Sequence, residues 1–513
     1  MTVASARRHK DCTLGELVAG LATAVPLDAV TSSLTLSGLQ LDSRLVAEGE
    51  LFLALFGRNQ DGRSYIPQAI GAGAAAILVE AGEGWSGVVF ESGVPIVAID
   101  GLAANASKIA ARFFGHPSEK LSITGITGTN GKTSCALFLS QALEALGRKS
   151  NSIGTLGYGA AKALQATQLT TPDAVSVQRM LSEFASRGSD CVSMEVSSIG
   201  LHQHRVQAVN FDTAVFTNLS RDHLDYHGTM EAYGQSKKKL FLRAELKRAV
   251  INLDDPFALS IINDLPPGVV LTTFSVQEAG ASVRAHNIAL SAQGLAFDLL
   301  TPVGEGRVQL GLLGEFNVGN VLAVAATLCA QVEQLSFEQL ASALAALRPV
   351  PGRMQRVEND EQGDLTVVVD YAHTPAALQS ALRGLRGHVD GRIHCLFGAG
   401  GNRDAGKRPL MAEVAERYAD TVCLSNDNPR FESPDAILDQ IAAGLSAPEL
   451  ASRVPDRALA IAQLIAVAEP GDAILIAGKG HETYQEIQGQ RHFFDDVAAA
   501  QEALKQRSGV QAK

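Results

Sequence analysis

Short runs of consecutive apolar residues alternate with longer amphipathic stretches along the chain. Such runs are typical of strands that are covered on both faces of a parallel sheet. Between them the spacing is helical: Cys135, Leu139 and Leu143 share one face of the stretch after a glycine-rich loop. The alternation predicts α/β layers. The strands we expect are Ala75–Val79, Ile96–Ile99, Leu121–Ile126, Cys191–Val196, Thr213–Phe216, Ala249–Asn252, Thr366–Asp370, Ile393–Phe397, Thr421–Leu424 and Ala473–Ile476.

Two turns with proline suggest domain boundaries. Pro117 precedes a new strand–loop–helix unit, and Leu347–Gln355 separates an Ala/Leu-rich helix from a new series of strands. We therefore expect three domains: an N-terminal α/β domain at 1–117, a central domain with a mostly parallel sheet at 118–347, and a Rossmann-like domain at 348–513.

Composition and charge narrow the class of protein. Hydrophobic residues make up 46% of the 513 residues, which excludes global disorder. The net charge of −11 argues against binding to nucleic acid or to anionic membranes. The sequence contains no apolar stretch of the ~18 residues that a membrane span needs, and its start lacks the apolar core of a signal peptide. Because the six cysteines form no C-x-x-C pair, we expect reduced thiols in a cytoplasmic protein.

The strongest local signal is SITGITGTNGKTS at Ser122–Ser134, where a strand leads through a glycine-rich loop into a helix. Glycines let backbone amides face an anion, and the helix N-terminus adds partial positive charge. The strict phosphate-loop pattern, G-x-x-x-x-G-K-[ST], requires a glycine at the position of Ile126, and Gly125 lies one residue before that position. Lys132 suits phosphate, and the Thr133 hydroxyl suits magnesium. We expect an ATP phosphate loop made of Gly128, Thr129, Asn130, Gly131, Lys132, Thr133 and Ser134.

Glu195 stands at the end of a buried strand in SMEVSSIGLHQHRV. A buried carboxylate is costly unless it meets a cation, so we expect a magnesium ligand, with a structural glutamate as the alternative. Ser197, Gln203 and Arg205 follow in what we expect to be a polar binding loop.

The segment Phe216–Phe241 brings acidic residues and two histidines to the end of another strand. The spacing of His223 and His227 would also suit zinc, but no third protein ligand is obvious, and His227 alone is more typical of a structural histidine. The segment ends in a run of three lysines, of which we expect Lys238 and Lys239 to be solvated.

These blocks together resemble a known family. GTNGKT, EVSSIGLHQHRV and TNLSRDHLDYHGTMEAY followed by Lys237, in this order, resemble the Mur ligases, ATP-dependent amide-forming enzymes of peptidoglycan synthesis. An N-terminal block, LDSRLVAEGELFLAL, resembles the UDP-sugar-binding segment of that family, so the resemblance covers nearly the whole chain. Further matching blocks are Gly314–Asn320, Val350–Gln355, Asp370–Pro375, Gly400–Met411, Asp427–Glu432 and Ala477–Glu482.

The block DNPR resembles the motif of the family members that add meso-2,6-diaminopimelate to UDP-N-acetylmuramoyl-L-alanyl-D-glutamate. Diaminopimelate differs from lysine by a distal carboxylate, which an arginine fork can bind through two hydrogen bonds. Lysine-adding members lack this arginine, so the resemblance implies that Arg430 selects diaminopimelate.

The resemblance also implies an acyl-phosphate mechanism with ATP and Mg²⁺. Its catalytic residues would be Lys132, Glu195, His223 and Lys237. Thr133 and Glu195 would hold one magnesium ion; His223 would help to hold a second, organised by a carbamate that CO₂ forms on Lys237. For the nucleotide it implies Asn317, Asn320, Arg353 and Asp370. For the UDP-linked dipeptide it implies Leu41, Ser43, Arg58, Asn59, Gln60, Leu169, Thr170, Thr171, Ser197, Gln203 and Arg205. For diaminopimelate it implies Arg403, Asp427, Asn428, Pro429, Arg430, Gly478 and Glu482.

Two alternatives stay open. One is a related ligase that adds lysine, D-alanyl-D-alanine or glutamate to a folate; the other is a nucleotide-gated binding protein without turnover. For a diaminopimelate-adding ligase and for a related ligase alike, the binding partners would be small molecules. We expect the protein to be a monomer.

Overall fold

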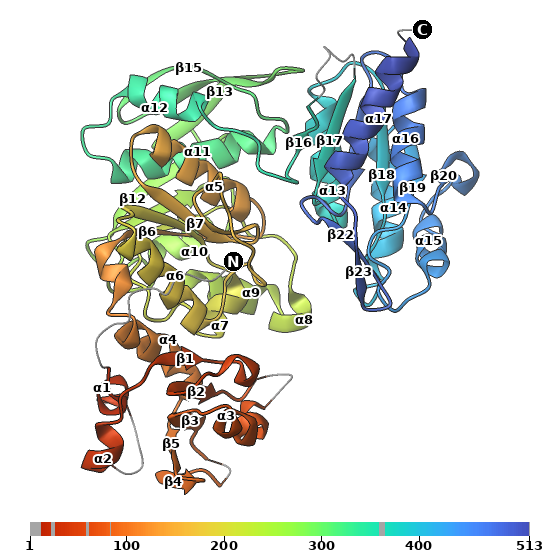
Figure 1. Cartoon of the computed structure of the whole chain (residues 1–513). Helices are drawn as coiled ribbons and strands as arrows, with labels where there is room; N and C mark the ends of the chain where they lie inside the picture. Colours follow the sequence, from red (N-terminus) through yellow and green to blue (C-terminus); the bar gives the residue numbers. More distant parts are fainter. Residues whose placement is uncertain (1–11, 22–25, 58–60, 83, 359–364, 512–513) are drawn as a thin grey trace. The chain divides into compact units, whose positions relative to one another are not determined.

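Parallel strands form most of the sheets in the computed structural model of the chain, which describes residues 12–21, 26–57, 61–82, 84–358 and 365–511 (Figure 1). The chain divides into two compact units. Unit 1 comprises Met1–Thr273 and Ala330–Glu333, and unit 2 comprises Phe274–Cys329 and Gln334–Lys513.

The first sheet of unit 1 has the strand order β1-β2-β3-β5-β4, and only β4 runs antiparallel to its neighbour. Leu53 and Leu78 pack on one face with helices α1 and α4, and Phe52 and Ile77 pack on the other. Because both faces are covered, these strands are continuous apolar runs. The elements are α1 (Leu14–Val18), α2 (Ala29–Ser32), β1 (Gly38–Gln40), β2 (Glu50–Ala54), α3 (Ile66–Gly71), β3 (Ala76–Glu80), β4 (Val88–Glu91), β5 (Val94–Ile99) and α4 (Leu102–Phe113).

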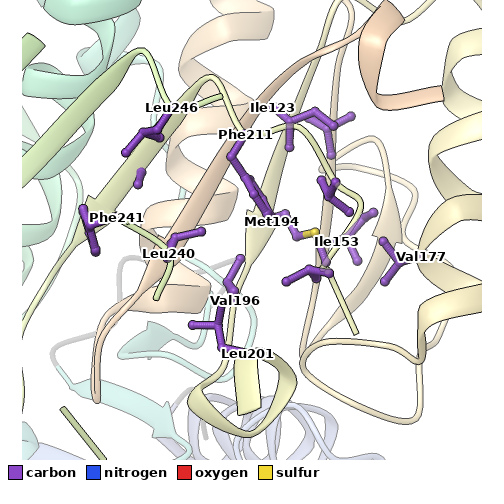
Figure 2. Close-up of a cluster of buried hydrophobic side chains, with 14 of the residues drawn as sticks. Ile123, Ile153, Val177, Met194, Val196, Leu201, Phe211, Leu240, Phe241 and Leu246 are labelled. Carbon is purple, nitrogen blue, oxygen red and sulfur yellow. The ribbon is translucent and has the colours of Figure 1, made fainter. Parts of the chain in front are cut away.

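Apart from β12 (Val270–Ser275), which crosses the boundary at Thr273, the remaining strands of unit 1 have the order β11-β10-β6-β9-β7-β8 and are parallel except for β8. Their core includes Ile123, Ile153, Met194 and Phe211, which Figure 2 shows as one packed cluster. Since β6, β9 and β10 are parallel neighbours, the loops that follow them lie at one edge. The elements are β6 (Ser122–Thr127), α5 (Lys132–Ala145), β7 (Ser150–Gly154), β8 (Gly157–Gly159), α6 (Ala174–Ser186), β9 (Cys191–Glu195), α7 (Ser198–His202), β10 (Thr213–Phe216), α8 (Leu224–His227), α9 (Met230–Lys238), β11 (Arg248–Asn252) and α10 (Ala258–Asn263).

Unit 2 begins with an antiparallel meander that the sequence analysis did not predict. Strands β13, β14 and β15 pair in succession, and buried and partly buried positions alternate along β14. This alternation is typical of an antiparallel sheet that packs one face on the core and turns the other towards solvent. The elements are β12 (Val270–Ser275), which leads into the meander, then β13 (Val283–Ser291), β14 (Gly294–Thr301), β15 (Gly304–Leu310), α11 (Phe316–Gln331) and α12 (Phe337–Ala345).

The second sheet of unit 2 has the order β16-β17-β21-β18-β19-β20, parallel except at β16. Two clusters of buried side chains cover its faces, and a separate hairpin, β22–β23, follows β21. The elements are β16 (Gln355–Arg356), β17 (Thr366–Asp370), α13 (Pro375–Arg386), β18 (Ile393–Phe397), α14 (Lys407–Tyr418), β19 (Thr421–Leu424), α15 (Pro434–Ala442), β20 (Ser452–Arg453), α16 (Arg457–Val467), β21 (Ala473–Ala477), β22 (Tyr484–Ile487), β23 (Gln490–Phe493) and α17 (Asp496–Gln511).

Every strand expected from the sequence is present, with ends within two residues of the expected ones, and the α/β class is confirmed. None of the described helices is both long enough and apolar enough to cross a membrane.

Candidate active site

The expected phosphate loop connects β6 to the N-terminus of α5. Gly128 has φ +153°, and a Cβ there would lie 1.9 Å from Thr217 Oγ1, so only glycine fits. Gly125 instead lies within β6, where a Cβ would come within 2.8 Å of the Phe211 ring. The early glycine of the motif therefore serves strand packing, and the loop begins at Gly128.

The segment after β10 braces this loop. Thr129 N donates to Asn218 O (2.8 Å), and Asn130 N donates to Asn218 Oδ1 (2.9 Å). Lys132 Nζ folds back over the loop and donates to the carbonyl oxygens of Gly128 (2.8 Å) and Thr129 (2.7 Å). A pre-formed loop, a cation and a helix N-terminus thus lie together, which is an arrangement that binds phosphate.

Glu195 lies at the carboxyl end of β9 and is 1% exposed. Its Oε2 accepts hydrogen bonds from Thr133 Oγ1 (2.9 Å) and Thr155 Oγ1 (3.2 Å), and its Oε1 accepts one from Thr155 N (2.8 Å). A carboxylate and a hydroxyl at the phosphate loop are the hard oxygen donors that Mg²⁺ prefers, so these residues fit the ion. Sequence reasoning missed Thr155, which belongs to no motif.

Lys237, on α9, is 1% exposed, and its Nζ donates to Gly128 O (2.6 Å). The Nζ also lies 4.4 Å from the centre of the Tyr233 ring. Burial and the charge of Lys132 lower the pKa of Lys237 well below its ordinary value, although Asp222 acts in the opposite direction. The neutral amine is the form that reacts with CO₂, so an environment that lowers this pKa fits carbamylation.

The solvated role expected for Lys238 is wrong. Its side chain is buried, forms an ion pair with Asp264 and donates to Ser260 Oγ (3.1 Å). Only Lys239 of the two is exposed. The reason is tertiary: a buried turn of α9 faces an acidic residue that follows α10.

His223 and His227 flank the same tyrosine. The ring centroids of His223 and His227 lie 6.0 Å and 5.3 Å from that of Tyr233. His227 Nε2 contacts Ser198 Oγ (3.0 Å), and burial lowers the pKa of His227. Within the described residues, no group of three His, Cys, Asp or Glu side chains is arranged to hold a metal ion. A metal here would therefore need substrate oxygens as further ligands.

The residues expected to bind the UDP-linked dipeptide cluster partly beside Glu195. Thr171 Oγ1 donates to Glu195 O (2.9 Å) and accepts from Ser197 N (2.9 Å), and Arg205 Nη1 donates to Thr171 O (2.7 Å). Gln203 Oε1 in turn accepts from Arg205 Nη2 (2.6 Å). Thr170 Oγ1 lies 3.0 Å from Thr155 Oγ1, and Leu169 is 46% exposed.

The segment after Glu195 differs from the polar loop we expected. Ser197 caps the short helix α7 by accepting from Gly200 N (3.0 Å), so the loop is replaced by a helical turn that ends before Gln203. The capping geometry follows from the serine side chain.

Leu41 and Ser43 line a cavity of about 380 Å³ beside the first sheet, together with Arg44, Tyr65 and Gln68. Ser43 Oγ donates to Gln68 Oε1 (2.9 Å). The expected residues Arg58, Asn59 and Gln60 lie outside the described residues.

In unit 2, the four residues expected to bind the nucleotide form two pairs. Asn320 Nδ2 donates to Asn317 Oδ1 (2.8 Å) on α11. Asp370, at the end of β17, accepts hydrogen bonds from two backbone amides, and burial raises its pKa against the charge of Arg353. The Arg353 guanidinium stacks 4.7 Å from the centre of the Tyr371 ring, and its buried Nε has no hydrogen-bond partner among the described residues. An unpartnered buried donor is consistent with a ligand contact.

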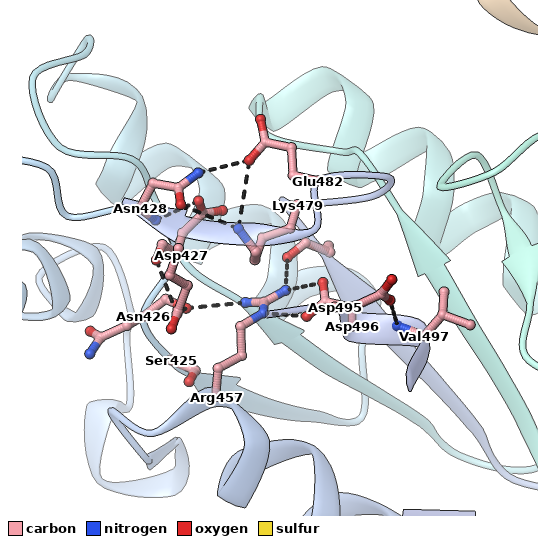
Figure 3. Close-up of polar contacts among 12 residues, drawn as sticks. Ser425, Asn426, Asp427, Asn428, Arg457, Lys479, Glu482, Asp495, Asp496 and Val497 are labelled. Atoms are coloured by element: carbon pink, nitrogen blue, oxygen red, sulfur yellow. Dashed lines mark hydrogen bonds and ion pairs between the residues drawn. The ribbon is translucent and has the colours of Figure 1, made fainter. Parts of the chain in front are cut away.

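Most residues expected to bind diaminopimelate follow three neighbouring strands, β21, β18 and β19. Asn428 Nδ2 donates to Glu482 Oε2 (2.7 Å), as Figure 3 shows. A Cβ on Gly478 would lie 2.6 Å from Asp427 Oδ2, so this glycine allows the two loops to approach. Burial and Asp427 raise the pKa of Glu482, and Lys479 opposes them.

Arg430 is held in a left-handed conformation, with φ +52°. Its N donates to Glu486 O (2.9 Å) and its O accepts from Gln488 N (2.7 Å), so the β22–β23 hairpin fixes its backbone. Its Nη1 donates to Gly401 O (2.8 Å), and its Nε lies 3.5 Å from Glu486 Oε2. Arg403 is exposed, and Pro429 is buried.

Sequence reasoning missed three buried charged residues beneath these loops. Arg457 binds Asp496 through two hydrogen bonds (2.7 and 2.8 Å) and donates to Ala477 O (2.9 Å). Lys479 lies within the matched block Ala477–Glu482, but nothing in the sequence shows that its ammonium turns inward. Arg457 and Asp496 belong to no block, so only the structure reveals them.

The fold and the phosphate-loop site define a nucleotide-dependent α/β protein of the phosphate-loop class. Comparison with known families identifies the family within this class. Residues 35–113 match the model described as Mur ligase family, catalytic domain, residues 126–328 the Mur ligase middle domain, and residues 352–480 the Mur ligase, glutamate ligase domain.

Individual relatives agree. The chain is 48% identical over 478 residues to UDP-N-acetylmuramoyl-L-alanyl-D-glutamate--2,6-diaminopimelate ligase of Ectopseudomonas mendocina, covering 93% of this chain and 97% of that one. It is 45% identical to the protein of that name from Coxiella burnetii, over 93% of this chain and 97% of the relative. A solved structure of a protein of that name matches with a TM-score of 0.70 and 34% identity, covering 97% of this chain and 99% of that one. The chain belongs to the Mur ligase family.

Proposed function

We propose that this protein is an ATP-dependent ligase that adds meso-2,6-diaminopimelate to UDP-N-acetylmuramoyl-L-alanyl-D-glutamate in peptidoglycan precursor synthesis. The observation that carries the chemistry is the convergence of Lys132, Thr133, Glu195 and Lys237 at one phosphate loop. The relatives that share this name at 45–48% identity support the choice of substrates.

In the first step, a free carboxylate of the dipeptide attacks the γ-phosphate of ATP and gives an acyl phosphate and ADP. The amides of the loop and Lys132 bind the phosphates and stabilise charge that develops on the transferred group. Thr133 and Glu195 would hold one Mg²⁺ ion, and His223, with a carbamate on Lys237, would help to hold a second; the ions would supply positive charge where the anions meet. Asn317, Asn320, Arg353 and Asp370 bind the rest of the nucleotide.

In the second step, the diaminopimelate amine attacks the acyl carbon, and phosphate leaves. Arg430 binds the distal carboxylate, since its fork offers parallel donors. Glu482, whose carboxylate lies within 2.7 Å of Asn428 Nδ2, accepts from a substrate ammonium group. Arg403, Asp427, Asn428, Pro429 and Gly478 complete the amino-acid site.

The UDP-linked dipeptide binds at Leu41, Ser43 and the segment 58–60, and at Leu169–Thr171, Ser197, Gln203 and Arg205. The domain division at 1–117, 118–347 and 348–513 belongs to the same proposal, and the three family matches, which each fall within one of these ranges, support it. We also propose a monomer that acts in the cytoplasm; its six free cysteines are consistent with a reducing compartment.

The test is phosphate release from Mg·ATP with UDP-N-acetylmuramoyl-L-alanyl-D-glutamate and either diaminopimelate or L-lysine. We expect release, and a tripeptide product by mass spectrometry, with diaminopimelate. Preference for lysine would identify a lysine-adding relative instead, and release that depends on neither amino acid would contradict a ligase.

A further inference from the structure

A completely buried ammonium group lies under the proposed diaminopimelate site. Lys479 is 0% exposed, although a lysine rarely lies inside a protein without a specific partner. Its position in the chain, directly after the glycine that lets two loops approach, places it between the loops that follow β19 and β21.

The ammonium group contacts both loops at once. Its Nζ donates to Asn428 Oδ1 (3.3 Å) and to the backbone oxygen of Tyr484, and lies 3.6 Å from Glu482 Oε2 (Figure 3). Asn428 is held from three sides, because its Oδ1 also accepts from Glu486 N (2.9 Å) and its Nδ2 donates to Glu482. The amide orientation of Asn428 is therefore fixed by a cation on its oxygen and a carboxylate on its nitrogen.

This network has a consequence for Glu482. Its carboxylate is buried beside Asp427, which favours the neutral acid, and the nearby Lys479 cation acts against this. Without that cation, Glu482 would turn towards other partners or take up a proton, and it would then bind a substrate ammonium group poorly.

We infer that Lys479 is a positioning residue for amino-acid selection: it touches no substrate, and it holds Asn428 and Glu482 in the geometry that recognises diaminopimelate. This inference rests on the proposed function. It adds a residue for which the sequence pattern assigned no role, and it predicts that the effect of Lys479 passes through Glu482.

The experiment compares steady-state kinetics of Lys479→Met with the wild-type protein. We expect the KM for diaminopimelate to rise by about tenfold or more, because a charged hydrogen-bond partner is lost. The KM values for ATP and the UDP-linked dipeptide should stay within about twofold, since the residues that bind these substrates do not contact Lys479.

The matched control is Asp472→Asn, which breaks a buried pair with His394 (3.0 Å) near the amino ends of the strands of the same sheet. It should lower the melting temperature without changing the KM for diaminopimelate.

A double-mutant cycle with Glu482→Gln separates positioning from general packing. If Lys479 acts through Glu482, the double variant should be little worse than the poorer single variant. Additive losses, an unchanged KM in Lys479→Met, or an equal rise in Asp472→Asn would overturn the inference. Should Lys479→Met not fold, Lys479→Gln, which keeps a donor but not the charge, enters the same cycle with the same criteria. Absence of any diaminopimelate-dependent turnover in the wild-type protein would contradict the proposed function instead.

Discussion

Lys237 shows how burial prepares a single residue for chemistry. Its amine is almost completely buried and lies close to a second lysine, Lys132, so the charged form is disfavoured. Lysine amines react with CO₂ only when they are neutral, and a lowered pKa makes this form available near neutral pH. The neighbouring Lys239 is exposed and has no such environment, although the sequence presents both as parts of one charge run.

We expect Lys237→Ala to reduce ligase activity by more than about 10²-fold, the usual cost of losing a group that stabilises the transition state. Added bicarbonate should not restore the activity, because no amine remains. Lys239→Ala is the matched control and should retain wild-type kcat. Phosphate-release assays at several bicarbonate concentrations measure both, and full activity in Lys237→Ala would show that this lysine has no catalytic part.

Arg430 determines amino-acid selection if its guanidinium binds the distal carboxylate. Two of its nitrogens already contact Gly401 O and Glu486, so its orientation is set before substrate binds. We expect Arg430→Ala to raise the KM for diaminopimelate by about 10- to 100-fold, the loss of a charge-assisted pair. Any turnover of lysine should change much less. Equal losses of turnover with both amino acids would mean that Arg430 supports the loop and does not bind the distal carboxylate.

At the scale of elements, the turn that ends β7 controls the position of Glu195. Gly154 is the last residue of β7, and a Cβ there would lie 2.1 Å from Glu195 Oε1. The larger side chain of Gly154→Ala would displace the carboxylate from Thr133 and Thr155. Since a misplacement of about 1 Å can cost ~10²-fold in rate, we expect a loss of that order in kcat. Gly280→Ala, at a position with open space and ordinary backbone geometry, should be neutral. A normal rate in Gly154→Ala would show that the position of Glu195 is not critical.

Prediction from the sequence succeeded for elements whose local pattern is decisive. Continuous apolar strands such as Thr366–Asp370 and the glycine-rich loop at Gly128 carry their own signal. The meander β13–β15 was missed because each strand is only half apolar and is defined by pairing with its neighbours. The burial of Lys238 and the inward turn of Lys479 depend on partners from other elements, which no local pattern shows.

At the scale of the whole molecule, an acidic chain with net charge −11 places its functional cations at strand ends. Lys132 and Lys237 lie at the carboxyl edge of the second sheet of unit 1, and Arg430 and Lys479 lie at that edge of the parallel sheet of unit 2. The net charge therefore argues against nucleic acid and anionic membranes as partners. The local positive charge indicates the phosphate and carboxylate groups that the protein binds.

The core around β17, β18 and β21 is separate from the core around β6 and β9, so we expect a stability change in the first to leave the second unaffected. Arg457 and Asp496 are a completely buried pair, and removing one partner of such a pair costs about 3–5 kcal/mol. We expect Arg457→Met to lower hydrogen-exchange protection of β17, β18 and β21 by this amount, while β6 and β9 in unit 1 keep theirs. Arg386→Met, which removes an exposed partner of Asp420, should cost less than about 1 kcal/mol. Segment-resolved hydrogen exchange distinguishes these outcomes. Equal losses in the two variants would show that burial does not set the strength of the pair, and a loss that reached β6 would show that the two cores unfold together.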